Sequence, residues 1–335
     1  MTTPADFHDQ ILDEVGTILL GNEEIVEGLT ISLLTKGHVL LEGVPGVAKT
    51  TIANAFAQAT GVNATRIQMT PDLLPADITG THIYREPIGE FELQKGPIFS
   101  NLVIADEINR ATPKTQSALL EAMEERTVTI EGDSLPLPSP FMVVATQNPI
   151  EMEGTYQLPE AQRDRFQLKL TVDIPDEETE LALIDQFNDQ PDIDISQISQ
   201  AITAEELVSA QTVVANVYVA EASKRYLREL VAATRTHTAI EHGGSPRATL
   251  ALLKTAKARA ALQGRTYVIP DDIKHLALPV LRHRLILNSE AELSDQSIDS
   301  VLDDVFSQVT APSGTTESQI KPPQAASDGG AENPL

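Results

Sequence analysis

Short strand-like segments alternate with helical periodicities over the first half of the chain. The segments lie at 38–41, 65–69, 102–105, 141–146 and 168–172. Apolar positions at helical spacing precede or separate them, as in residues 7–36 and 52–57. Strands that alternate with helices are typical of an α/β protein whose sheet is parallel. The pattern therefore predicts a parallel sheet flanked by helices over residues 1–174.

After residue 174 the pattern changes to helices alone. Thr203 and Glu206 have the spacing of a capping box, and Ser245-Pro246 begins a further apolar periodicity. We expect a smaller all-α domain over 175–308. Pro, Gly, Ser and Gln dominate from there on, so residues 309–335 are predicted to be a disordered tail.

Two β-hairpins are predicted within the first domain, near 82–94 and 127–138. Each pairs two short β-like runs around a turn that contains Gly, Gly89 in the first and Gly132 in the second. Both lie between the segments assigned to the sheet, so they are insertions into the α/β pattern.

A glycine-rich loop follows the first predicted strand and runs into a helix. Its residues are Gly43, Val44, Pro45, Gly46, Val47, Ala48, Lys49, Thr50 and Thr51. A strand, a Gly-rich turn and a helix that begins with Lys-Thr form a cradle for phosphate, because backbone N–H groups and the helix dipole face the anion. Lys49 is expected to reach the terminal phosphates, and the Thr50 hydroxyl to hold Mg²⁺.

One loop position departs from the G-x-x-x-x-G-K-[ST] pattern, because Ala48 stands at the second Gly. We predict that Ala48 has a negative φ. We then expect Gly43 or Gly46 to adopt any left-handed conformation that the loop requires.

Polar side chains end the third and fourth predicted strands. Asp106 and Glu107 follow the run 102–105, and Asn148 follows 141–146. Strand C-termini of open α/β sheets border the ligand crevice. Asp106 is expected to coordinate Mg²⁺ through water, Glu107 to polarise the attacking water, and Asn148 to bond that water or the γ-phosphate.

Three arginines are candidates for contact with phosphate. Arg163 and Arg165 end a short predicted helix and point in different directions, and either is a candidate for an arginine finger that reaches into a neighbouring subunit. Arg247 lies in the first turn of a helix, where a cation opposes the helix dipole and a bound phosphate would offset that cost.

Composition excludes several classes of protein. Asp and Glu total 49 against 24 Lys and Arg, a formal net charge of −25, which argues against passive binding of nucleic acid. There is no Cys, and the seven His show no metal-site spacing. The sequence has no signal-like segment and no apolar run of the roughly 20 residues that span a bilayer. We expect a soluble, cytoplasmic protein with an acidic surface.

Five segments in this order resemble the MoxR family of AAA+ ATPases. They are the loop 43–50, Ala105-Asp-Glu-Ile-Asn-Arg-Ala111, Ala145-Thr-Gln-Asn-Pro149, Leu158 through Phe166 with its Asp-Arg-Phe ending, and Ser245-Pro-Arg247. The resemblance spans about residues 14 to 288, and Ala48 falls within the family's own pattern.

The resemblance implies a sheet of five parallel strands in the order 5-1-4-3-2, a helical lid, and a homo-oligomeric ring, usually hexameric. It places both hairpins at the pore of the ring. By position Asn148 resembles sensor 1, Arg165 the arginine finger, and Arg247 sensor 2. The implied function is ATP-driven, Mg²⁺-dependent remodelling or maturation of protein clients, including proteins with von Willebrand factor A domains, with metal or cofactor insertion as a recurrent theme.

Three alternatives stay open. A chelatase-type AAA+ subunit shares the same motifs. A nucleic-acid motor needs cationic hairpins, but the predicted hairpins carry more acids than bases, so nucleic acid is an unlikely partner. A nucleotide-gated scaffold that hydrolyses slowly is the third, and the set of Asp106, Glu107, Asn148 and Arg165 argues against it.

Overall fold

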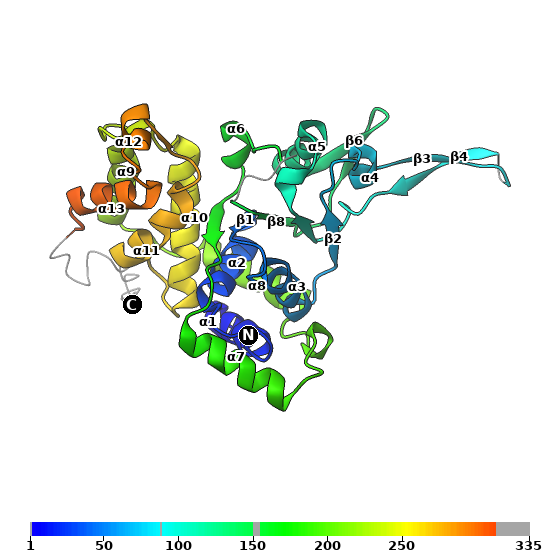
Figure 1. Cartoon of the computed structure of the whole chain (residues 1–335), viewed down its shortest axis with the longest axis horizontal. Coiled ribbons are helices and arrows are strands. Elements are labelled where there is room, and N and C mark those ends of the chain that lie inside the picture. Colours follow the sequence, from blue (N-terminus) through cyan, green and yellow to red (C-terminus); the bar gives the residue numbers. More distant parts are fainter. Residues whose placement is uncertain (1, 88, 150–154, 313–335) are drawn as a thin grey trace, which may run out of the picture.

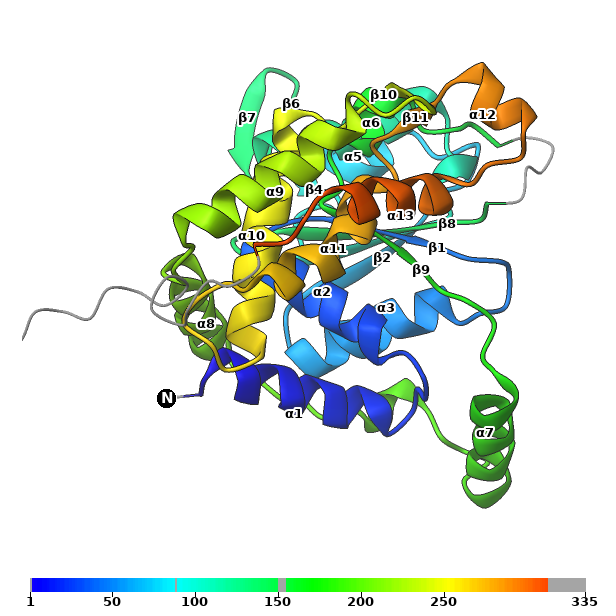
Figure 2. The same cartoon turned by 90° about the vertical axis from the view of Figure 1, so that its left-hand side faces the viewer.

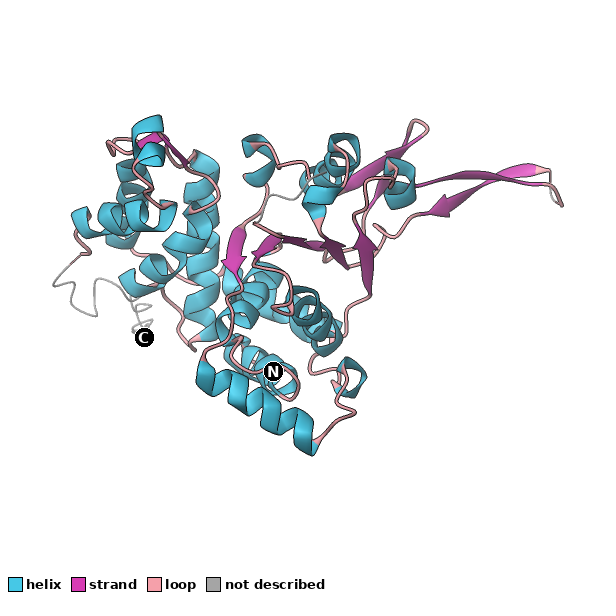
Figure 3. Cartoon of the chain, in the orientation of Figure 1, coloured by secondary structure: helices cyan, strands magenta, loops and turns pink. Residues whose placement is uncertain are grey.

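A parallel sheet of five strands forms the centre of the molecule, and a helical part lies beside it (Figures 1 and 3). The computed structural model describes residues 2–87, 89–149 and 155–312 of the 335. The expected tail, 309–335, therefore lies almost wholly outside the described residues.

The sheet has the strand order β2-β5-β8-β1-β9. Numbered along the chain and read from the other edge, this is 5-1-4-3-2, so the expected order is confirmed. All neighbours pair in parallel, and the central strand β8 lies between β5 and β1. The strands are β1 (Val39–Glu42), β2 (Ala64–Gln68), β5 (Leu102–Asp106), β8 (Met142–Gln147) and β9 (Leu168–Thr171).

The three central strands of the sheet are buried on both faces, and their side chains divide by the two-residue period of a strand. In β5, Leu102 and Ile104 belong to one apolar cluster, whereas Val103 and Ala105 belong to another. The first cluster includes residues of α1, α2 and α3, and the second includes residues of α5 and the hairpin β6–β7. Two covered faces hold the strand ends rigidly, which positions the polar residues that follow them.

Helices of the sheet-containing part begin at recognisable caps. Thr3 closes a capping box, and Thr112 caps a helix that has Pro113 at its first position. The helices here are α1 (Pro4–Gly16), α2 (Glu23–Thr35), α3 (Lys49–Thr60), α4 (Pro75–Thr79), α5 (Pro113–Glu125), α6 (Glu160–Arg163) and the 3₁₀ turn η1 (Ile108–Arg110).

Both predicted hairpins are present. The first consists of β3 (Gly80–Arg85) and β4 (Glu90–Lys95), and it projects far from the body in Figure 1. The second consists of β6 (Thr127–Ile130) and β7 (Asp133–Pro136) and packs closer to α5. Whether either faces a pore stays a prediction.

The second half of the chain is helical, but not entirely so. A two-stranded antiparallel sheet, β10 (Ile240–His242) with β11 (Ile286–Leu287), corrects the expectation of helices alone. Strands of two or three residues are too short to give a readable period. The helices are α7 (Glu177–Asp189), η2 (Ile195–Gln197), α8 (Ala204–Ala215), α9 (Glu221–Thr234), α10 (Pro246–Leu262), α11 (Pro270–Leu281), α12 (Ser289–Leu293) and α13 (Ile298–Gln308).

The helical part is joined to the sheet-containing part by packing as well as by sequence. Helices α8 and α10 contact α1 and α2, and one apolar cluster runs across all four. The domain boundary at 174 stays a prediction. No helix in the described ranges is long and apolar enough to cross a membrane.

Candidate functional site

The glycine-rich loop connects the end of β1 at Glu42 to the start of α3 at Lys49. Gly46 has φ +93°, which confirms that a loop Gly takes a left-handed conformation. Ala48 has φ +61°, so the prediction of a negative φ at Ala48 was wrong. The last residue before α3 must turn the chain into the helix, and this geometry requires positive φ even of a residue with a Cβ. An alanine in that region carries strain of about 1–2 kcal/mol.

Gly43 is required for close approach rather than for positive φ. A Cβ at this position would lie 2.3 Å from the carbonyl oxygen of Val172, just beyond β9. The loop therefore leaves β1 in direct contact with the end of the neighbouring strand, and a larger residue would displace one of the two segments.

Lys49 turns back over the loop and is almost buried, with 8% of its surface exposed. Its ammonium donates to the carbonyl oxygens of Gly43 at 2.6 Å and Val44 at 2.8 Å, and to Asn148 Oδ1 at 2.9 Å. Burial lowers the pKa of Lys49, while the nearby carboxylates of Asp106, Glu107 and Glu42 oppose that shift. The structure thus brings the predicted lysine and the predicted amide together.

Asp106 is the best-partnered carboxylate of the site. Its Oδ1 accepts from Thr50 at 2.8 Å and from Thr146 at 2.6 Å, and its Oδ2 accepts from Arg66 at 2.6 Å. Burial alone would raise the pKa of Asp106, but these hydrogen bonds outweigh it, and the pKa lies below its ordinary value. The carboxylate is therefore charged at neutral pH and shares a hydroxyl contact with Thr50, as a Mg²⁺ site requires.

Glu107 leaves the strand in a left-handed conformation, with φ +57°. Its Oε2 accepts from Gln68 at 3.0 Å and from Arg110 at 2.7 Å, and its Oε1 accepts from Asn148 at 3.3 Å. The Glu107 N–H donates to Thr146 Oγ1 at 2.8 Å. Strained backbone that neighbouring contacts hold in place is common at functional sites. It points a side chain in a direction that a relaxed strand would not allow.

The two candidate finger arginines face different surroundings. Arg163 lines a cavity of about 290 Å³ together with Glu42, Gln147 and Asn148, so it faces its own chain's site. Arg165 instead forms an ion pair with Glu124 of α5 at 3.0 Å. The separate directions predicted for the two side chains are observed.

Arg247 lies beside Arg165 rather than beside Lys49. Its Nη2 contacts Glu124 at 2.6 Å, and its Nη1 lies 3.8 Å from Asp164. Among the described residues, neither Arg165 nor Arg247 forms a hydrogen bond or ion pair with the phosphate loop. One carboxylate, Glu124, therefore holds both arginines in a separate cluster.

Several residues of the site were missed by sequence reasoning. Arg66 and Gln68 reach the acids from β2, and Thr146 reaches both acids from β8. Gln68 pairs with Asp106 in the sheet register, so a correct register would have pointed to it. The sequence around Glu124 did not indicate that it would contact the arginines, because it lies on an ordinary amphipathic helix.

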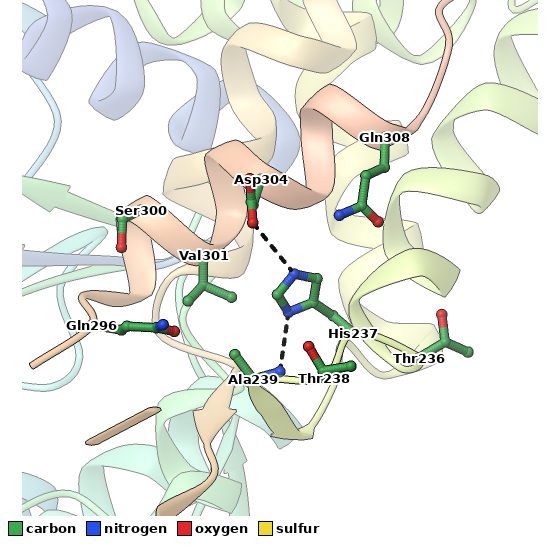
Figure 4. A pocket seen from close by; sticks show the side chains of 9 residues that line it. All are labelled: Thr236, His237, Thr238, Ala239, Gln296, Ser300, Val301, Asp304 and Gln308. Carbon is green, nitrogen blue, oxygen red and sulfur yellow. Dashed lines mark hydrogen bonds and ion pairs between the residues drawn. The ribbon is translucent and has the colours of Figure 1, made fainter. Parts of the chain in front are cut away.

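A larger cavity, of about 560 Å³, lies elsewhere, between the end of α9 and α13 (Figure 4). His237 Nδ1 accepts from the N–H of Ala239 at 3.3 Å, and its Nε2 lies 3.9 Å from the carboxylate of Asp304. Its other lining side chains are mostly neutral and polar. The cavity lacks a glycine-rich loop and a cationic group, so it is not the phosphate site.

The fold and the loop define a nucleotide-binding ATPase of the AAA class. Residues 38–168 match the ATPase family associated with various cellular activities, and residues 232–305 match the AAA lid domain. An ATPase candidate of known structure from Cytophaga hutchinsonii superposes with a TM-score of 0.84 at 40% identity, covering 92% of this chain and 96% of that one.

Relatives that match over most of their length show which family of this class the chain belongs to. Chaperone MoxR1 of Mycobacterium tuberculosis is 44% identical over 91% of this chain and 82% of its own length. Protein MoxR of Paracoccus denitrificans is 31% identical over 92% of this chain and 98% of its own length. YeaC of Bacillus subtilis is 45% identical over 90% of this chain and 93% of its own length. The chain belongs to the MoxR family of AAA+ ATPases.

Proposed function

We propose that this protein hydrolyses ATP and uses the energy to remodel or mature partner proteins. One observation carries the proposal. The loop lysine, the hydroxyl–carboxylate pair of Thr50 and Asp106, and the carboxylate of Glu107 meet at the carboxyl ends of three adjacent strands, linked through Asn148 and Thr146. Acid, amide and lysine in one network are the parts that phosphoryl transfer needs.

The donor set fits ATP with Mg²⁺. Bound Mg²⁺ supplies neutralisation of the charge that develops on the phosphate oxygens. Thr50 offers a hydroxyl oxygen and Asp106 a charged carboxylate, the oxygen ligands that Mg²⁺ takes. Lys49 exchanges its carbonyl partners for phosphate oxygens. Glu107 accepts a proton from the attacking water and orients it, and Asn148 holds the Glu107 carboxylate in place.

Arg165 and Arg247 are proposed to act on the nucleotide of a neighbouring subunit. Their separation from the phosphate loop of their own chain supports this assignment, as does the contact of Arg163 with the cavity beside Asn148. An arginine supplied in trans is worth roughly 10³–10⁵ in rate. Hydrolysis then requires a homo-oligomeric ring, which we propose to be hexameric.

The clients are proposed to be proteins, including those with von Willebrand factor A domains, and metal or cofactor insertion is one form such maturation takes. Relatives that cover about half of this chain include a magnesium-chelatase 38 kDa subunit of Acidiphilium rubrum, 32% identical over 54% of this chain. The β3–β4 hairpin does not favour nucleic acid, since its Arg85 already pairs with Glu92 at 2.8 Å.

Replacing Glu107 tests the proposal. Glu107→Gln keeps the size of the side chain and an oxygen that accepts the hydrogen bond from Asn148, but it removes the base, so the rate of ATP hydrolysis should fall at least about 100-fold. Binding of a fluorescent ATP analogue should be retained. Glu125→Gln, an exposed change on α5, is the matched control and should leave both unchanged. Turnover that persists in Glu107→Gln would refute the assigned role.

A further inference from the structure

Helix α7 carries an apolar stripe that no residue in the described ranges covers. Leu181, Ile184 and Phe187 are 55%, 60% and 51% exposed. They fall within an arc of about 120° on the helix, since successive residues are about 100° apart. The opposite side of α7 rests on the α1–α2 connection, where Gln186 donates to the carbonyl oxygen of Thr17 at 2.7 Å. This hydrogen bond ties α7 to the end of α1, and the apolar face of α7 points outward.

The charges of α7 are all of one sign. The helix has five acids, Glu177, Glu178, Glu180, Asp185 and Asp189, and neither Lys nor Arg. Asp185 borders the apolar stripe on the side of Leu181, and Glu180 lies within the arc of the stripe, one turn before Ile184. An exposed amphipathic helix with an acidic border fits an apolar groove that has a basic border.

Such a groove lies between α2, α8 and α10. It has a volume of about 490 Å³, with Leu34, Val208, Val214 and Ala215 among its apolar lining. Three lysines border it, Lys36, Lys254 and Lys257, although the whole chain has only 10 lysines and a net charge of −25. Among the described residues none of the three forms an ion pair, and Lys257 donates only to the carbonyl oxygen of Ala215 at 2.5 Å. The groove is thus a rare cationic surface with unpaired charge.

The helix and the groove cannot meet within one molecule. Figure 2 shows α7 at the lower right and α8 at the left, on opposite sides of the protein. Two complementary patches on opposite sides generate a head-to-tail contact between copies, which closes into a ring when the rotation allows it.

The position of the lysines on α10 links the groove to the proposed trans site. Arg247, Lys254 and Lys257 stand at spacings of seven and three residues, so they share one face of the helix. If Arg247 faces a neighbouring subunit, as proposed above, the same face turns both lysines toward that neighbour.

We propose that α7 of one protomer docks into the α2–α8–α10 groove of the next and forms part of the ring interface. This inference rests on the proposed ring and names the surfaces that build it. Leu181, Ile184 and Phe187 fill the apolar floor, and Glu180 and Asp185 pair with the bordering lysines. Like-charged acidic chains repel, so a local pairing of opposite charges also fixes which surfaces meet.

Engineered disulfides test the contact directly, because the chain has no Cys. Ile184→Cys and Lys254→Cys are made as separate full-length variants, mixed with ATP and oxidised. A disulfide forms only when the Cα atoms approach within about 7 Å. We expect a crosslinked dimer from the mixture and a ladder of crosslinked oligomers from the double variant. Leu181→Cys in place of Ile184→Cys tests a second position along the apolar stripe of α7. Leu293→Cys, at an exposed site on α12, is the control that should not crosslink to Lys254→Cys.

Charge reversal gives an independent measurement. Lys36→Glu with Lys254→Glu should raise the concentration for half-assembly at least tenfold in sedimentation velocity. Lys224→Glu, an exposed lysine on α9, should leave it unchanged. Assembled protein that yields no crosslink from either α7 position, with assembly unmoved by the lysine changes, would overturn this inference and leave the ring proposal standing. The groove would then serve another partner. Protein that stays monomeric with ATP at all concentrations would overturn both.

Discussion

At the scale of single residues, the site is held by contacts that cross between strands. That Lys49, Thr50, Asp106, Glu107 and Asn148 lie together could be predicted, because each stands at a strand end or in the loop. Arg66 and Thr146 could not, because their contact with Asp106 depends on which strands are neighbours and in which register. The conformation of Ala48 was predicted wrongly, since the tolerance of a methyl group was taken to imply negative φ.

Ala48 allows a direct test of that strain. Ala48→Gly removes the cost of a Cβ at φ +61° but adds backbone freedom to the unfolded chain. The first effect is the larger, so the free energy of unfolding should rise by roughly 0.5–1 kcal/mol. Urea unfolding of the wild type and of Ala48→Gly measures this difference in the free energy of unfolding. Ala222→Gly within α9 is the control and should lower stability by roughly 0.5–1 kcal/mol. A loss of stability in both variants would mean that position 48 is not strained.

At the scale of elements, the strands, the hairpins and two helix starts were predictable because period and capping are local signals, whereas the strand order came from the resemblance to a family. The five strands, both hairpins and the caps at Thr203 and Ser245 are as predicted. The pair β10–β11 was missed because it joins segments more than 40 residues apart through only a few backbone contacts. The arginine cluster around Glu124 was missed for a related reason, since it assembles from α5, the end of α6 and α10.

His38 connects three elements and makes their stability depend on pH. It is 5% exposed, its Nδ1 accepts from the Val143 N–H of β8 at 2.9 Å, and its Nε2 donates to the Met123 carbonyl oxygen of α5 at 3.1 Å. Burial lowers the pKa of His38 to about 4. Below the ordinary pKa near 6.5 the unfolded chain binds the proton and the folded chain does not, so stability falls as pH falls from about 6.5 toward 4.

The expected loss is roughly 1 kcal/mol between pH 7.5 and 5.5 from this group alone. Urea unfolding of the wild type and of His38→Gln at both pH values measures the part of the stability loss that comes from His38. The variant is less stable at pH 7.5, because a buried pairing is disturbed, but its pH-dependent loss should be smaller by about that amount. An identical pH-dependent loss in both proteins would show that His38 does not carry the effect.

At the scale of the whole molecule, the described chain divides the parts of an ATPase between two places. The loop, Asp106, Glu107 and Asn148 form one network, and Arg165 with Arg247 forms another around Glu124. Under the proposed function, a single chain presents half a site at each place. Membership of the MoxR family was predictable from five short motifs, whereas the client protein leaves no mark in the residues of the site.

Mixing two inactive variants tests whether the ATP site is shared between neighbouring subunits. Lys49→Ala disables the phosphate loop and Arg165→Ala disables the proposed finger, so neither should hydrolyse ATP appreciably alone. In an equal mixture about one interface in four joins an intact loop to an intact arginine, because heterologous contacts pair different surfaces of neighbouring chains. The mixture should therefore recover about a quarter of the wild-type ATPase rate per subunit. A mixture that co-assembles in sedimentation velocity yet stays as inactive as its components would contradict an ATP site shared between subunits.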